Sequence, residues 1–291
     1  MEIVKLGLPT GSLKEPTLEI FRKAGYRISV EARSYFPIID DEGMECTLIK
    51  PQEIPLYVQD GVLDVGITGK DWLEEAGSEE IEEVAELTYS RSGMRPVRLV
   101  LAVPYDSPIT RVEELEGKKI ATELVHNTRQ YLEQKNIKAQ VVFSWGSTEV
   151  KPPWLADAIS ELTETGSSLR ANHLRIIDTI LVSTPRVVVN HNSWKISWKK
   201  KKIEHMVTLL QGALTAEKRV ALKMNISEEN LKVAMEMLPA LRRPTISNLY
   251  EEGWVAVETI VEEREVKELI GRLKEVGAEG ILEYSLNKII P

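Results

Sequence analysis

Short apolar runs alternate with amphipathic stretches over the first two-thirds of the chain. Ile3 to Leu8 reads as a strand, and a helix with Leu18, Phe21 and Ala24 on one side follows it. Further runs rich in Val, Ile and Leu occupy residues 27–30, 63–68, 97–103, 120–123, 139–143 and 176–182. Strands separated by helical stretches of this length predict an α/β fold with mainly parallel sheets.

Two segments look like crossings between separate lobes of this α/β region. The first is the polar stretch 91–96, and the second is the return at 187–190. We predict two lobes with a ligand cleft between them, because such clefts form at the carboxyl ends of strands and at domain interfaces. The predicted boundaries are 1–94 plus 185–208 for lobe I, 95–184 for lobe II and 209–291 for a third domain.

The last third of the chain has a different order of elements. Strand-like runs at 218–225, 244–249, 254–261 and 280–286 are interrupted by helical patterns that begin after Ser227 and near Val266. The order βαββαβ is that of a ferredoxin-like module. No catalytic constellation accompanies it, so we expect this domain to have a regulatory or assembly role.

Composition narrows the class of protein. The 291 residues include 45 acidic and 37 basic side chains, a formal charge of −8, which argues against a duplex nucleic-acid binder. The four consecutive lysines at 199–202 are therefore interpreted as a solvated helix face. Cys46 is the only cysteine, and we recognise neither a signal peptide nor an apolar run that could span a bilayer. We expect a cytoplasmic protein that does not associate with a membrane.

The segment from Asp157 to Asn172 is the strongest candidate for chemistry. An apolar strand end leads into hydroxyls packed around Gly166 and then into a helix start. Glycine accepts a positive φ, so backbone N–H groups and hydroxyls can converge there on a phosphate. Upstream, the carboxylate of Glu161 can accept hydrogen bonds from ribose hydroxyls or help to hold Mg²⁺. Taken alone, the segment fits an ordinary turn with a helix N-cap slightly better.

Two further strands end in polar loops that contain glycine. Residues 9–13 follow the first strand, and Thr68-Gly69 ends the strand that contains Gly66, where the missing side chain permits close approach of backbone or ligand. Three such loops can converge on one cleft.

Other chemistries are poorly supported, since the four histidines lack the spacing of a zinc site and no Gly-x-Ser-x-Gly or Gly-x-Gly-x-x-Gly motif is present.

Longer motifs carry a more specific signal. They are PTGSL (9–13), IPLYV (54–58), GVLDVGITGKD (61–71), LADAI (155–159), TGSSLRANHL (165–174), PTISNL (244–249) and GWVAV (253–257). In this order along the chain, they resemble the motifs of the long form of ATP phosphoribosyltransferase, the enzyme of the first step of histidine biosynthesis. The resemblance covers nearly the whole chain.

The resemblance implies a fold and a reaction. The family has two lobes like those of type II periplasmic binding proteins and a C-terminal ACT-like regulatory domain that binds histidine. Its members transfer 5-phosphoribosyl from phosphoribosyl pyrophosphate to N1 of ATP and release pyrophosphate, with Mg²⁺ as cofactor. The long form is a homo-oligomer, from dimer to hexamer, and histidine inhibits it by feedback. Nucleic acid and membrane are not among the implied partners.

Residue roles follow from the same resemblance, position by position. Glu161 is implied as the catalytic residue, which holds the ribose hydroxyls and, directly or indirectly, Mg²⁺. The residues implied in binding phosphoribosyl pyrophosphate are Asp157, Thr163, Thr165, Gly166, Ser167, Ser168 and Leu169. Those implied in binding ATP are Gly11, Ser12, Leu13, Arg33, Lys50, Asp64, Thr68 and Gly69. Those implied in a histidine effector site are Asn225, Leu241, Arg243, Thr245 and Gly280.

The sequence departs from the family pattern at several positions. Thr10 and Lys50 stand where lysine and arginine are common, and the second change gives up bidentate phosphate contact. Asn225 and Arg243 stand where an acidic and a small residue are usual, which is expected to weaken histidine binding. Two alternatives stay open. One is a non-catalytic small-molecule sensor on a binding-protein fold, and the other is a prephenate dehydratase-like enzyme, whose Thr-Arg-Phe motif is absent here.

Overall fold

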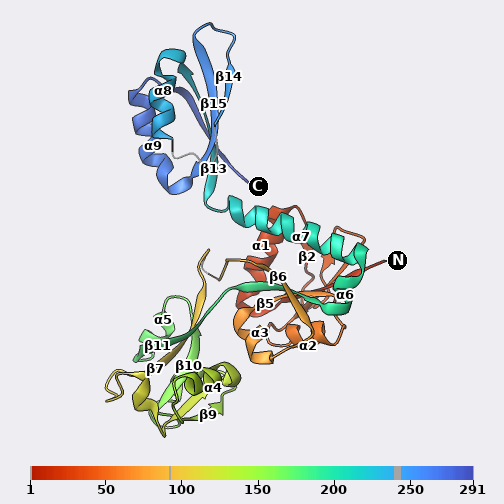
Figure 1. Ribbon diagram of the computed structural model, residues 1–291, viewed down its shortest axis with the longest axis vertical. Helices are drawn as coiled ribbons and strands as arrows, with labels where there is room; N and C mark the ends of the chain where they lie inside the picture. Colours follow the sequence, from red (N-terminus) through yellow and green to blue (C-terminus); the bar gives the residue numbers. More distant parts are fainter. Residues whose placement is uncertain (1, 92, 239–243, 291) are drawn as a thin grey trace. The chain divides into compact units, whose positions relative to one another are not determined.

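Figure 1 shows the computed structural model of the chain, which describes residues 2–91, 93–238 and 244–290. The chain divides into two compact units, residues 1–207 and 208–291. Within the described ranges, no helix is both long enough and apolar enough to cross a membrane.

The first unit contains two five-stranded sheets, each with its own helices. The strands of one sheet follow the order β4 (Met44–Ile49), β1 (Val4–Pro9), β5 (Val65–Gly69), β12 (Pro185–Asn190) and β6 (Ile81–Glu86). Its helices are α1 (Lys14–Ala24), α2 (Ile54–Gln59), α3 (Lys70–Ala76), α6 (His191–Lys195) and the short 3-10 helix η1 (Gly11–Leu13). A small hairpin of β2 (Ile28–Ser29) and β3 (Ile38–Ile39) belongs to the same part of the chain.

The strands of the other sheet follow the order β11 (Leu174–Ser183), β7 (Val97–Pro104), β10 (Ala158–Thr163), β8 (Lys119–Thr122) and β9 (Gln140–Phe143). Its helices are α4 (Val125–Gln134), α5 (Ser167–Ala171) and the 3-10 helices η2 (Val112–Leu115) and η3 (Thr148–Val150). The chain crosses between the sheets after β6 and returns after β11 (Figure 1). This confirms the predicted α/β class and the two-lobed arrangement of type II periplasmic binding proteins.

Both sheets are mixed, so the prediction of mainly parallel sheets is wrong. β1 runs parallel to β4 and β5, and β8 runs parallel to β9 and β10. In contrast, β7 and β12 are antiparallel to both of their neighbours. The crossings explain this, because β12 begins opposite Gly69 at the end of β5 and β7 begins beside Thr163 at the end of β10. A strand that arrives from the other sheet enters at the carboxyl edge and runs back along its neighbour.

Gly66 allows α2 to pack closely on the first sheet. A Cβ atom at this position would lie 2.4 Å from Cγ2 of Ile54 and 3.2 Å from Cγ2 of Val58. Both of these α2 side chains are fully buried. The glycine in β5 therefore serves close packing of the protein with itself, and not the approach of a ligand.

Two lysines fix the start of the long helix α7 (Ser197–Ala216) to the first sheet and its loops. Nζ of Lys199 lies 2.5 Å from Oδ1 of Asp64, and Nζ of Lys202 lies 2.5 Å from Oδ1 of Asp41. Both lysine side chains are less than one-third exposed. The interpretation of residues 199–202 as a solvated face is therefore wrong for these two positions. Their partners lie more than a hundred residues earlier in the chain, where charge patterning cannot find them.

The second unit is a four-stranded antiparallel sheet with two helices. Its elements are β13 (Arg219–Ser227), α8 (Glu228–Met237), β14 (Thr245–Asn248), β15 (Trp254–Glu262), α9 (Glu263–Glu275) and β16 (Glu279–Ser285). The strand order is β14-β15-β13-β16, which confirms the ferredoxin-like βαββαβ prediction. Both helices cover one face of the sheet (Figure 1), because alternate residues of β13 and β15, such as Leu222 and Val257, pack against Leu269 and Leu273 of α9.

Candidate active site

The loop between β10 and α5 is organised by its own hydroxyls. Gly166 has a φ of +73° and its N–H donates to Oγ1 of Thr163 at 2.9 Å. Oγ1 of Thr165 and Oγ of Ser167 lie 3.0 Å apart, and the Ser168 hydroxyl donates to Oε1 of Glu149 at 2.6 Å. These hydrogen bonds hold the hydroxyls of the loop in defined positions.

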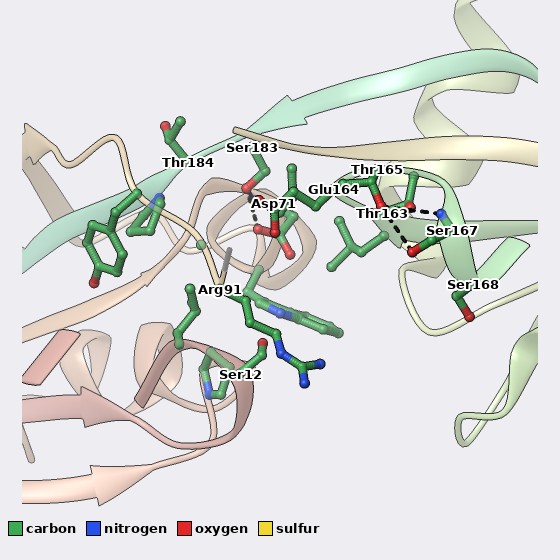
Figure 2. A pocket seen from close by; sticks show the side chains of 18 residues that line it. Ser12, Asp71, Arg91, Thr163, Glu164, Thr165, Ser167, Ser168, Ser183 and Thr184 are labelled. Carbon is green, nitrogen blue, oxygen red and sulfur yellow. Dashed lines mark hydrogen bonds between the residues drawn. The ribbon is translucent and has the colours of Figure 1, made fainter. Parts of the chain in front are cut away.

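This loop faces residues of the other lobe across a cavity of about 550 Å³. Thr163, Thr165, Ser167 and Ser168 line the cavity, in Figure 2 on the far side from Ser12. The loop after β1 contributes Ser12 and Leu13, and the end of β5 contributes Gly69. The structure thus brings residues of all three polar loops to one cavity, at the carboxyl ends of β1, β5 and β10.

Asp157 is not brought to this cavity. It precedes the first residue of β10, at the other end of the strand from the loop. Its Oδ2 accepts a hydrogen bond from the backbone N–H of Lys119 at 2.8 Å, and its Oδ1 lies 3.9 Å from Nζ of Lys118. These contacts join the starts of β8 and β10, so the position of Asp157 indicates a structural role.

Asp64 is also remote from the cavity, because it lies before β5 at the amino end of the first sheet. Only 4% of its surface is exposed, and its carboxylate accepts hydrogen bonds from Lys5 N, Ser193 Oγ and Lys199 Nζ. Burial alone would raise the pKa of Asp64, but these hydrogen bonds outweigh it and hold that pKa below its usual value. Asp64 therefore anchors the start of α7 to the first sheet.

The remaining residues expected at the site fall outside the lining of this cavity. They are Gly11, Arg33, Lys50, Thr68, Gly166 and Leu169. Leu169 packs in the apolar core of its lobe, and Thr68 is fully buried with its hydroxyl donated to the carbonyl of Pro51 at 2.7 Å. Lys50 lines a neighbouring cavity, and Arg33 is exposed with a φ of +66°. Gly166 shapes the loop through its positive φ.

Glu161 lies two residues before Thr163 in β10, so the two side chains point to the same face of the sheet. Its side chain is not among those that line the cavity. Burial raises the pKa of Glu161 to about 7, a hydrogen bond from Thr148 opposes this, and the nearby charges of Glu149 and Glu123 add to it. A carboxyl group with such a pKa changes its protonation state near neutral pH.

Several residues at or beside this cavity were not predicted as site residues, and three of them carry charged side chains with defined positions. Asp71, at the start of α3, is buried and accepts a hydrogen bond from Ser183 Oγ, and burial is the main cause of its raised pKa. Arg91 is the only arginine or lysine among the described residues that line the cavity, and in Figure 2 its guanidinium points into the open space beside Ser12. Arg170 donates from Nη1 to the carbonyl oxygen of Thr165 at 3.0 Å.

Each of these has a signal in the sequence, because Asp71 ends the motif at 61–71, Arg91 begins the predicted crossing at 91–96, and Arg170 follows the loop by one helical turn. Asp71 reaches the cavity because α3 begins directly after β5, and Arg91 because it lies in the crossing that follows β6. Among the described residues, no three His, Cys, Asp or Glu side chains are placed to hold a metal ion.

In the second unit, the structure brings together two of the expected effector residues. An ideal Cβ atom at Gly280 would lie 3.6 Å from Nδ2 of Asn225, in the neighbouring strand. Thr245 lies in β14, which is separated from β13 by β15. Leu241 and Arg243 lie outside the described residues.

Comparisons with known proteins agree with these features. A family model described as ATP phosphoribosyltransferase matches residues 50–212, and one described as HisG, C-terminal domain matches residues 216–288. The chain is 58% identical over 290 residues to an ATP phosphoribosyltransferase from Thermodesulfovibrio yellowstonii, covering 100% of this chain and 99% of the relative. This chain belongs to the ATP phosphoribosyltransferase family.

Other ATP phosphoribosyltransferases match at similar length. One from Chlorobium phaeovibrioides is 57% identical over 288 residues, 99% of this chain and 98% of the relative. A solved structure, the ATP phosphoribosyl transferase (HisG:HisZ) complex from Thermotoga maritima, matches with a TM-score of 0.61 and 29% identity over 73% of this chain and 98% of that chain. As a member of this family the chain is a pentosyltransferase of histidine biosynthesis, which sets aside the sensor and prephenate dehydratase alternatives.

Proposed function

We propose that this chain transfers the 5-phosphoribosyl group of phosphoribosyl pyrophosphate to N1 of ATP, giving N1-(5-phosphoribosyl)-ATP and pyrophosphate. The observation that supports this best is the hydroxyl-rich loop from Thr163 to Ser168, which faces Ser12 and Gly69 across one cavity. Hydroxyl and backbone N–H donors suit the 5-phosphate group, because they bind its oxygens without adding a fixed charge.

In this reaction, the main task of the protein is to position the two substrates. The lone pair of adenine N1 forms a bond to C1 of the ribose while the bond from C1 to the pyrophosphate oxygen breaks, and pyrophosphate leaves with that electron pair. In this proposal the loop binds the 5-phosphate, Glu161 accepts hydrogen bonds from the ribose hydroxyls, and Arg91 contacts phosphate oxygens. Fixed donors and charges of this kind act by orientation and electrostatic stabilisation.

Mg²⁺ belongs in this proposal as an ion bound to the substrate. The described residues contain no cluster of three or more His, Cys, Asp or Glu side chains placed to hold a metal ion, and Mg²⁺ commonly takes one or two carboxylates together with substrate phosphates. When bound, the ion neutralises the charge of the leaving pyrophosphate. Glu161 is the carboxylate proposed to face it.

The proposal includes regulation and assembly. The second unit would bind histidine as a feedback inhibitor, with Asn225 and Gly280 in the effector site, and the chain would assemble as a homo-oligomer, from dimer to hexamer. Residues 1–94 plus 185–208 would form lobe I, residues 95–184 lobe II, and residues 209–291 the regulatory domain. Asp64 and Asp157 are left out of the ligand-binding set, because their carboxylates hold other parts of the chain.

The activity can be tested by absorbance at 290 nm after mixing the purified protein with ATP, phosphoribosyl pyrophosphate, Mg²⁺ and pyrophosphatase. The proposal expects a steady rise, because adenine ribosylated at N1 absorbs there, and a strong loss of that rise in Glu161→Ala. Glu133→Ala, an exposed carboxylate of α4, is the matched control and should keep wild-type turnover. No rise with the wild type would overturn the proposed reaction.

A separate arm tests regulation. The same assay is repeated with histidine, and inhibition that disappears when the second unit is removed would support the effector assignment. A rise that is indifferent to histidine would keep the transferase and refute feedback inhibition.

A further inference from the structure

A second cavity of about 550 Å³ has aromatic walls supplied by both lobes of the first unit. Trp72 comes from α3, and Phe143 and Trp145 come from the end of β9 and the loop after it. Trp145 is 92% exposed, Phe143 is 53% exposed, and their ring centroids lie 4.8 Å apart in an edge-to-face arrangement. Large apolar rings left open to solvent in a concave site are typical of a ligand-binding wall.

This aromatic cavity adjoins the phosphate-binding loop. Trp72 lines both cavities, so they meet at its side chain. Glu123 also lines the aromatic cavity, and its charge is close enough to Glu161 to raise the pKa of that residue. Thr148, three residues after Trp145, donates a hydrogen bond to Glu161. The aromatic cavity therefore lies beside the carboxylate proposed to hold the ribose.

The carboxylates of this cavity favour a ligand with N–H donors, while Lys50 adds one cation to its lining. Of its three carboxylates, Glu75 is already occupied by hydrogen bonds from the backbone N–H groups of His126 and Asn127 and from the Asn127 side chain. Neither Glu53 nor Glu123 has a hydrogen-bonded or ion-paired side-chain partner among the described residues. An ionised carboxylate only accepts hydrogen bonds, so it binds an amino group and repels a carbonyl oxygen.

We propose that this cavity selects the base of the acceptor nucleotide, with Trp145 stacking on an aminopurine ring and Glu123 accepting a hydrogen bond from its 6-amino group. This inference rests on the proposed function and extends it to the choice of base. We assign the contact with the 6-amino group to Glu123 and not to Glu53, because Glu123 lies near Glu161.

In this position, Glu123 would also stabilise the positive charge that develops on the purine during the reaction. When N1 bonds to C1 of the ribose, the positive charge on the purine spreads from N1 to the 6-amino nitrogen. Glu123 beside that nitrogen stabilises this charge, and no proton needs to move in the step. A 6-oxopurine would instead present an oxygen to the Glu123 carboxylate.

The stacking role is tested with two matched variants. Trp145→Ala removes a wall of the cavity, whereas Trp154→Ala removes an equally exposed indole that lines neither cavity; Trp154 is 90% exposed. We expect Trp145→Ala to raise KM for ATP about tenfold, the usual cost of losing one base–aromatic stack. KM for phosphoribosyl pyrophosphate should stay within twofold, and Trp154→Ala should match the wild type in both.

Binding without turnover gives a second readout. ATP alone should quench the tryptophan fluorescence of the wild type and of Trp154→Ala, and this quenching should be reduced in Trp145→Ala. Unchanged KM for ATP in Trp145→Ala, or an equal rise for both substrates, would overturn the stacking assignment. Because both indoles are exposed, neither substitution removes core packing, and equal melting temperatures check this.

The role of Glu123 is tested by base choice. Because N1 of a 6-oxopurine carries a proton and offers no free lone pair, base choice is measured as binding and not as turnover. We expect the wild type to bind ATP about a hundredfold more tightly than inosine 5′-triphosphate, since the 6-oxygen would face the Glu123 carboxylate. Glu123→Gln should reduce this preference about tenfold, because its amide can donate to the 6-oxygen, and Glu133→Gln should preserve it. Equal preference in Glu123→Gln and the wild type would refute the inference, whereas a wild type without turnover of ATP and phosphoribosyl pyrophosphate would refute the proposed function itself.

Discussion

The carboxylate of Glu75 accepts hydrogen bonds from both the backbone N–H of Asn127, at 3.0 Å, and its side-chain amide, at 3.1 Å. It also accepts the N–H of His126 at 2.9 Å. The residue at the N-cap of α4, Leu124, has no side-chain acceptor, so Glu75 of α3 caps a helix of the other lobe. The same asparagine donates to the carbonyl of Asp71, which lines the cavity beside the loop from Thr163 to Ser168.

Glu75→Ala is expected to destabilise the first unit. The substitution leaves two helix N–H groups and one buried amide without their acceptor, at a cost of about 2 kcal/mol in the free energy of unfolding. Urea unfolding followed by circular dichroism measures this. Glu74→Ala, in the same helix but in an exposed pair with Lys70, should change stability by less than about 0.5 kcal/mol. Equal effects of the two variants would refute the capping role.

Glu161 is expected to make stability depend on pH. Its pKa is raised from 4.5 to about 7 in the folded chain, so between these values the native state holds a proton that the unfolded chain has lost. Stability therefore falls as pH rises from about 4.5 to 7, by about 2 to 3 kcal/mol. In urea unfolding, the wild type should lose stability between pH 5 and pH 8, and Glu161→Gln should lose much less over the same range. Parallel pH profiles of the two proteins would contradict the raised pKa.

Asp64→Ala is expected to act on stability and not on ATP binding. The substitution leaves Lys199 without its buried partner and removes the acceptor of Ser193 Oγ, at a cost of about 3 kcal/mol. At a temperature where the variant is still folded, KM for ATP should remain within twofold of the wild type. A large rise in that KM without loss of stability would return Asp64 to the ligand site.

Gly166→Ala is expected to weaken binding of phosphoribosyl pyrophosphate. An alanine at a φ of +73° is strained by about 1 kcal/mol, and its Cβ would meet Nη1 of Arg170 at 3.0 Å. The distorted loop should raise KM for phosphoribosyl pyrophosphate about tenfold. Gly271→Ala is a useful control, because this glycine lies inside α9 with open space around it and should gain about 0.5 kcal/mol.

Local sequence was sufficient to predict most of the elements and the hydroxyl-rich turn between β10 and α5. The period of apolar residues predicts most strands and helices, including the βαββαβ order of the second unit. The loop from Thr163 to Ser168 is also largely local, since most of its hydrogen bonds join residues two to five positions apart, and only that from Ser168 to Glu149 reaches further. Features that depend on neighbours in the chain can be predicted from the order of residues alone.

Only the tertiary structure decided whether a polar side chain lines a cavity or pairs with another part of the chain. Asp64 and Asp157 look like ligands beside glycine-rich motifs, yet long-range hydrogen bonds to Lys199 and Lys119 occupy their carboxylates. Trp145 has no local signal, because the loop after β9 brings it to a cavity lined by residues of both lobes. When two partners lie far apart in the sequence, the assembly of the sheets decides their pairing. The periodicity of apolar residues does not predict it.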